Sequence, residues 1–109
     1  MAQNYKVLGQ IAPSATTATA VYTVPAATEA VVSSVTICNR AASTGTFRLA
    51  VRPNGATLAN EHYVVYDTSI AANDTVVLTI GLTLDAADVL EAYASSADMS
   101  FNAYGSEIS

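Results

Sequence analysis

The stretch Thr46-Phe47-Arg48-Leu49-Ala50-Val51-Arg52 decides the fold, because apolar side chains recur along it at every second residue. A period of two places successive side chains on opposite faces of a β-strand. The odd-numbered positions therefore predict a core face, and Arg48, Ala50 and Arg52 an outward face. Pro53-Asn54-Gly55 follows, and Asn-Gly is the strongest short signal for a hairpin. The next apolar run starts at His62, which predicts a connection longer than a two-residue turn.

Similar short runs, separated by turn residues, lie on both sides of this stretch. We expect strands at Tyr5–Leu8, Ala18–Val24, Glu29–Asn39, Thr46–Arg52, His62–Asp67, Val76–Leu82, Val89–Ala94 and Met99–Tyr104. Strand signals at this spacing are typical of sandwiches and jelly rolls. The sequence predicts an all-β fold, a single jelly-roll-like β-sandwich domain over residues 1–109 with about eight short antiparallel strands.

Three local features sharpen or complicate this prediction. In the run Glu29–Asn39, Val31, Val35 and Ile37 predict the core face, and Cys38 the opposite one. The segment 85–94 is ambiguous, because Asp85 could cap a helix of good helix formers or open a turn that leads into a strand. The five glycines are scattered at predicted turns or strand ends, where they serve backbone geometry.

The charge balance excludes some classes of partner. The chain of 109 residues has a net charge of −5, with one lysine and three arginines. A nucleic-acid binder needs a basic stripe to displace counterions from phosphates, so we expect no nucleic acid and no anionic membrane as partner. Charged residues make up 12% of the chain, against about 25% in typical domains. Removing water from a surface with so few charges costs little free energy. Such a composition is typical either of a subunit covered by neighbours or of a small neutral domain.

Residues that could perform chemistry are sparse. His62 is the single histidine and Cys38 the single cysteine, too few for a zinc site, and the serines lack a Gly-x-Ser-x-Gly elbow. Asp85, Asp88 and Asp98 are the nearest approach to a calcium cluster, although Asp85 is also suited to an Asx turn. We expect no catalytic residues, no metal and no cofactor, and therefore no enzyme.

An interaction face is the better expectation. If the runs around Arg48 and Tyr66 pair antiparallel, then Arg48, Arg52, His62 and Tyr66 share an outward face, with arginine stacked on tyrosine. The chain has six tyrosines and no tryptophan. The tyrosines could close the ends of the core, or they could form a platform for a glycan.

Two segments resemble a known group of proteins. The run Val21-Tyr22-Thr23-Val24-Pro25-Ala26, continued by residues 31–40, and the ending from Leu84-Asp85-Ala86-Ala87-Asp88-Val89 through Phe101 to Ile108 are similar to small β-sandwich structural proteins of tailed bacteriophages, cyanophages among them. The likeness covers nearly the whole chain but carries no site residue. Ala87 departs from it, because glycine often stands there, and this leaves the helical alternative for 85–94 open.

The resemblance implies a virion component. It would be a head decoration or cement protein, or a part of the neck, tail or fibre, made in the host cytoplasm because the first residues resemble no leader. We expect a homo-oligomer, a ring or with preference a trimer, docked on other virion proteins. The alternative of a different class is a glycan-binding module for host attachment.

Overall fold

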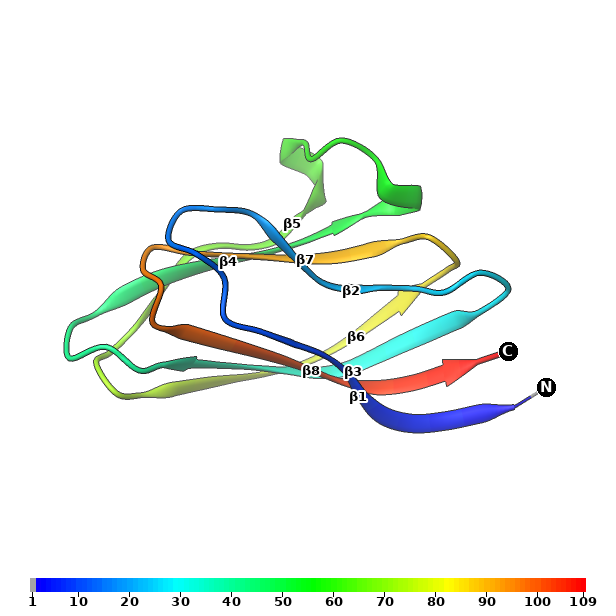
Figure 1. Ribbon diagram of the computed structural model, residues 1–109, viewed down its shortest axis with the longest axis horizontal. Helices are drawn as coiled ribbons and strands as arrows, with labels where there is room; N and C mark the ends of the chain where they lie inside the picture. Colours follow the sequence, from blue (N-terminus) through cyan, green and yellow to red (C-terminus); the bar gives the residue numbers. More distant parts are fainter. Residues whose placement is uncertain (1) are drawn as a thin grey trace.

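A computed structural model describes residues 2–109, which form eight strands in two four-stranded antiparallel sheets (Figure 1). One sheet has the order β1-β8-β3-β6 and the other β2-β7-β4-β5. This is the strand order of a jelly roll, and it confirms the predicted all-β sandwich. The strands are β1 Gln3–Ile11, β2 Thr19–Thr23, β3 Glu29–Asn39, β4 Gly45–Arg52, β5 Tyr63–Ile70, β6 Thr75–Leu84, β7 Val89–Ala94 and β8 Met99–Ile108.

The ambiguous segment 85–94 is a turn followed by strand β7, so the helical alternative is wrong. Two hydrogen bonds hold the turn, because the Asp88 carboxylate accepts from the amides of Asp85 and Asn54, at 2.8 Å each. Ala87 has a φ of 69°, which a right-handed helix does not contain. Ala87 therefore adopts the conformation that glycine favours.

The predicted core face of β3 is wrong at its first residue. Val31 is only half-buried, whereas the next residue, Val32, is fully buried. The reason is a β-bulge. From Val32 to Ser34 the strand advances two residues while its partner β8 advances one, from Gly105 to Tyr104. The extra residue shifts the alternation, so that the inward face changes from even to odd positions.

Gly9 and Gly105 were expected at strand ends, and both lie inside strands. A Cβ atom at Gly9 would collide with the carbonyl oxygen of Val21 in the other sheet, and one at Gly105 with that of Val31. These glycines allow close approach of two backbones rather than a turn.

The core lies between the sheets. Phe47 of β4 and Phe101 of β8 meet edge to face with ring centroids 6.2 Å apart, which joins the two layers. Asn39 is fully buried, and its amide group donates to the carbonyl oxygens of Ser43 and Ile70 while accepting from the Ala41 amide. The largest of the fully buried side chains are Phe47, Phe101, Ile37, Leu49, Ile70, Leu90, Met99, Val32, Val35 and Asn39.

The two lateral sides of the sandwich differ. On the closed side, formed by edge strands β1 and β2, the sheets meet (Figure 1). There the hydroxyl of Tyr22 donates to a Glu107 carboxylate oxygen at 2.5 Å, and Lys6 Nζ donates to the other oxygen at 3.0 Å. On the open side, formed by edge strands β5 and β6, the backbones of the two sheets stay farther apart. The inward-facing Val76, Leu78, Ile80 and Leu82 of β6 are only half-buried there.

Candidate interaction face

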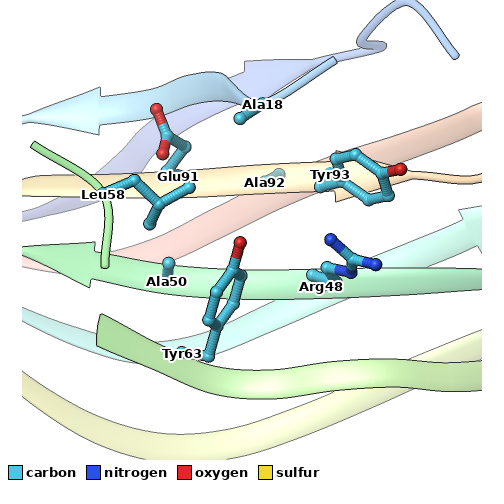
Figure 2. A pocket seen from close by; sticks show the side chains of 8 residues that line it. All are labelled: Ala18, Arg48, Ala50, Leu58, Tyr63, Glu91, Ala92 and Tyr93. Carbon is cyan, nitrogen blue, oxygen red and sulfur yellow. The ribbon is translucent and has the colours of Figure 1, made fainter. Parts of the chain in front are cut away.

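A cluster of aromatic side chains surrounds Arg48 on the outer face of the sheet β2-β7-β4-β5. We call Arg48, Tyr63, Tyr66 and Tyr93 the tyrosine–arginine cluster. The guanidinium carbon of Arg48 lies 4.1 Å from the ring centroid of Tyr66 and 4.2 Å from that of Tyr93. The rings of Tyr63 and Tyr66 meet edge to face at 4.9 Å. Figure 2 shows Arg48, Tyr63 and Tyr93 standing on three neighbouring strands.

The strand pairing explains this cluster. β4 pairs with β5 on one side and with β7 on the other, which brings Arg48 opposite Tyr93. Register shifts between β4 and β5 occur on both sides of Leu49. They turn Tyr66 over Arg48, and Asp67 takes a positive φ of 51°. The expected stacking of Arg48 on Tyr66 is therefore present, with Tyr93 as a second ring.

Asp67 balances the charge of the cluster. Its carboxylate accepts two hydrogen bonds from Arg48, at 2.7 Å from Nε and 3.3 Å from Nη2. This pairing holds the pKa of Arg48 above, and the pKa of Asp67 below, their ordinary values. Because the Arg48 charge is matched, the cluster presents aromatic surface with little net charge, which is typical of the centre of a protein interface.

The chain between β4 and β5, residues 53–62, lies across the same sheet face, and we call it the strap. It contains two 3₁₀ turns, Pro53–Gly55 and Asn60–His62. Arg52 Nη1 donates to two strap carbonyl oxygens, those of Gly55 at 3.1 Å and Ala56 at 2.9 Å. Arg52 Nε lies 3.3 Å from a carboxylate oxygen of Glu91, which is largely buried.

The other two residues of the predicted face, Arg52 and His62, make local contacts in the strap. The Nδ1 atom of His62 accepts a hydrogen bond from the Ala59 amide at 3.0 Å. Both residues hold the strap, whereas Arg48 and Tyr66 belong to the cluster. The face predicted from the sequence therefore divides into two neighbouring parts.

A small hollow separates the strap from the cluster (Figure 2). Its open space is about 170 Å³, below the roughly 300–1,000 Å³ of sites that enclose small molecules. Its walls carry one positive and one negative side chain among apolar and aromatic ones. The lining residues are Ala18, Arg48, Ala50, Leu58, Tyr63, Glu91, Ala92 and Tyr93.

The remaining candidates from the sequence have local roles or lie apart. Cys38 is a half-buried free thiol on β3. Asp85 accepts a hydrogen bond from the Ala86 amide and Asp88 holds the same turn. Among the residues that the structure describes, no three His, Cys, Asp or Glu side chains are grouped to hold a metal ion. Nor does the described chain contain a helix that is long and apolar enough to cross a membrane.

Sequence reasoning missed Asp67 and Glu91, and it counted Tyr93 among the six tyrosines without placing it beside Arg48. Tyr93 alternates outward with Glu91 along Val89–Ala94, and this pattern was available in the sequence. That β7 lies beside β4 was not, because the neighbour depends on the topology of the whole sandwich. A scan against protein-family models gives no match for this chain, and a search of curated proteins gives none.

Proposed function

We propose that this chain is a non-enzymatic structural subunit of a bacteriophage virion. The specific assignment is a head decoration or cement protein, which forms a homo-oligomer and stabilises the capsid by packing on other virion proteins. A place in the neck, tail or fibre is the alternative within the same class.

The open side of the sandwich carries this proposal. Edge strands of natural proteins are usually protected by charges, proline or short length, because an unpaired edge invites association. Strand β6 has ten residues, from Thr75 to Leu84, with neither a charge nor a proline. Four of its aliphatic side chains, Val76, Leu78, Ile80 and Leu82, are half-buried, and Val77 is exposed. Such an edge is suited to a protein that functions in an assembly, because neighbouring subunits cover the edge there.

Two further observations support the assignment. Jelly rolls recur in viral capsid proteins and in lectins, and the fold alone does not choose between them. The resemblance of the segments around Val21 and Phe101 to phage structural proteins favours the virion. The single histidine and the most buried carboxylate, His62 and Glu91, are both engaged in holding the strap, which supports a structural role.

The test is to locate the chain in particles from its natural source by electron cryomicroscopy of the whole assembly. We expect many symmetric copies on the outside of the capsid shell. Copies in the neck, tail or fibre would overturn the decoration assignment and keep the virion role. Particles that lack the chain would overturn the proposal.

A glycan-binding module is the second candidate, and the tyrosine–arginine cluster favours it. Tyr66 is 57% exposed beside Tyr63, so a sugar ring could stack on it. The test is a glycan array with the folded wild type and the variants Tyr66→Ala and Tyr5→Ala. Binding that Tyr66→Ala alone abolishes would support this candidate, and a wild type without any hit would remove it.

A further inference from the structure

Strand β6 reads nearly the same in both directions. From Thr75 to Thr83 its sequence is Thr-Val-Val-Leu-Thr-Ile-Gly-Leu-Thr, with Thr79 at the centre. Positions at equal distance from Thr79 match in chemistry. Threonine stands at both ends, and aliphatic residues stand at the second and fourth positions from each end. Only Val77 and Gly81 differ in size.

The two faces of β6 follow the same symmetry. The odd positions from Thr75 to Thr83 are exposed, and the even positions between them are half-buried toward the core. This alternation is unbroken, although the pairing of β6 with β3 shifts register between Thr79 and Leu82. In an antiparallel pair, directly opposite residues point to the same face of the sheet. A second β6 strand centred on Thr79 would therefore place threonine opposite threonine and Val77 opposite Gly81 on the outer face, and aliphatic opposite aliphatic on the inner face.

The other edge strands of residues 2–109 are less suited to such pairing. β1 contains Lys6. β2 has five residues and is followed two residues later by Pro25. β5 contains Asp67 at a positive φ. Charge, proline and short length discourage strand addition at an edge. Register shifts do not distinguish β6, because β1, β5 and β6 each have at least one against their neighbours.

We propose that two copies of this chain pair antiparallel along β6 about a two-fold axis that passes through Thr79. The axis is normal to the sheet, so the sheet β1-β8-β3-β6 continues into its copy and the inner faces remain on the same side. Thr75 then lies opposite Thr83 of the second copy, Val76 opposite Leu82, and Leu78 opposite Ile80. The pairing deepens the proposed function, on which it rests for its place in a virion, because it gives the homo-oligomer a contact.

Charge and symmetry select a second copy as the occupant. Each chain has a net charge of −5, so two copies approach with least repulsion along an uncharged strand. A two-fold interface brings the same surface patch of both subunits together, which requires a self-complementary surface. The palindrome of β6 meets this requirement. A contact of this kind gives dimers or assemblies with an even number of copies, and so differs from the trimer expected from the sequence.

The first test is the mass of the purified protein by light scattering after gel filtration. We expect a dimer, or an even multiple, for the wild type. Thr79→Lys places two lysines at the axis, and we expect it to weaken association at least tenfold. The matched control is Thr23→Lys, on exposed edge strand β2, which should keep the wild-type mass. A trimer, or a wild-type monomer at millimolar concentration, would overturn the inference.

The second test is disulfide trapping in a Cys38→Ser background. Thr79→Cys should cross-link to itself, because residues opposite in a sheet lie within the roughly 4.4–6.8 Å that a disulfide spans between Cα atoms. Thr83→Cys alone should not, because its two copies would be about 26 Å apart along the strand. A mixture of Thr75→Cys and Thr83→Cys should give the mixed disulfide. Circular dichroism checks that each variant is folded.

The two proposals fail in different ways. An oligomer in which Thr79→Cys does not cross-link, or in which Thr83→Cys cross-links to itself equally well, would overturn the β6 pairing and leave the virion role intact. A dimer with the expected cross-links would support the pairing even if particles lacked the chain, which would overturn the virion role.

Discussion

The closed and open sides show two ways to finish the edge of a sandwich. On the closed side, Gly9 lets the backbone of β1 approach β2, and Tyr22 reaches across to Glu107 of the other sheet. Backbone and side chains there satisfy each other within one subunit. On the open side, β5 and β6 carry half-buried aliphatic side chains. The polar link between the sheets there is the Asn39 amide of β3, which donates to the Ile70 carbonyl oxygen at the end of β5.

The difference indicates that the closed side stabilises the subunit and that the open side is available for assembly. On the closed side, the polar groups of Tyr22, Glu107 and Lys6 bond to one another. They therefore leave few free donors or acceptors for a partner protein. The open side leaves its apolar side chains and strand edge for a neighbour. Changes on the closed side should therefore lower the stability of the subunit, whereas changes on the open side should leave it unaltered.

The largest difference in the free energy of unfolding is expected when glycine is replaced by alanine on each of the two sides. Gly9→Ala forces a Cβ atom against the Val21 carbonyl oxygen, and we expect it to lower the free energy of unfolding by about 1–3 kcal/mol or more. A Cβ atom at Gly81, on the open side, would meet no other atom within 4 Å. Gly81→Ala should therefore stay within about 0.5 kcal/mol of the wild type. Urea unfolding at low protein concentration measures both, and equal losses would contradict the comparison.

Removal of the bridging hydroxyl should have the next largest effect. Tyr22→Phe keeps the buried ring but deletes the hydrogen bond to the Glu107 carboxylate, which should cost about 1.5–3 kcal/mol. The matched change on the other sheet edge is Tyr66→Phe, whose hydroxyl belongs to an exposed side chain. Thermal unfolding should show a lower Tm for Tyr22→Phe alone. A Tm unchanged by both would mean that the closed side is held by packing only.

The loss of stability in acid should depend on Glu107 of the closed side. The Tyr22 hydroxyl and then Lys6 hold the pKa of Glu107 below its ordinary value of 4.5. Its contribution to stability is therefore complete above pH 4.5 and is lost as pH falls through the lower value in the folded protein. Glu107→Gln should flatten the decline of the unfolding free energy in this range. An unchanged acid slope in the variant would assign the decline to other carboxylates.

At alkaline pH the stability depends on Tyr22, the hydrogen-bond partner of Glu107, and it should fall as pH rises. Burial, and then the hydrogen bond to Glu107, raise the pKa of Tyr22. The contribution of the Tyr22 phenol is thus complete below pH 10 and is lost as pH rises toward its value in the folded protein. Unfolding curves between pH 9 and 11 should fall more steeply for the wild type than for Tyr22→Phe.

The smallest effect is expected at the ion pair of the tyrosine–arginine cluster. Asp67 is 44% exposed, so its attraction to Arg48 is screened by salt. Asp67→Asn should lower the unfolding free energy slightly at low ionic strength, and the difference should vanish at about 1 M salt. Denaturant titrations at two salt concentrations measure it. A loss that persists in high salt would mean that this pair stabilises the subunit as Glu107 does.

The sequence predicted the strands well where turn residues limited them on both sides. β3 and β7 begin and end at the predicted residues. β3 lies between clear turn signals, whereas β7 was predicted beside a helical alternative for 85–94. The core face of β3 was mispredicted at Val31, since a period of two holds only without a bulge. The bulge depends on how β3 pairs with β8, and local sequence does not contain that pairing.

The candidate site was predictable in part for the same reason. Arg48 and Tyr66 lie on strands that follow each other in the chain, so antiparallel pairing brought them together in the prediction. Tyr93 comes from β7, a neighbour of β4 only because of the jelly-roll order. Arg52 was expected on the same outward face, but its ion pair with Glu91 of β7 could not be predicted, because it also depends on the strand order. Contacts between consecutive strands were thus accessible to sequence reasoning, and those made by the global topology were not.

The pairing of β1 with β8 has a consequence for the time course of synthesis. Gln3 lies opposite Ile108, and the backbones of Ala2 and Ser109 exchange two hydrogen bonds. A ribosome adds about 5–20 residues each second, so β1 waits roughly 5–20 s before its partner strand emerges. The sheet that begins with β1 can therefore close only after β8 has been released. Until then β1 lacks its partner strand, and the edge of β3 that pairs with β8 is also exposed to other nascent copies on the same messenger.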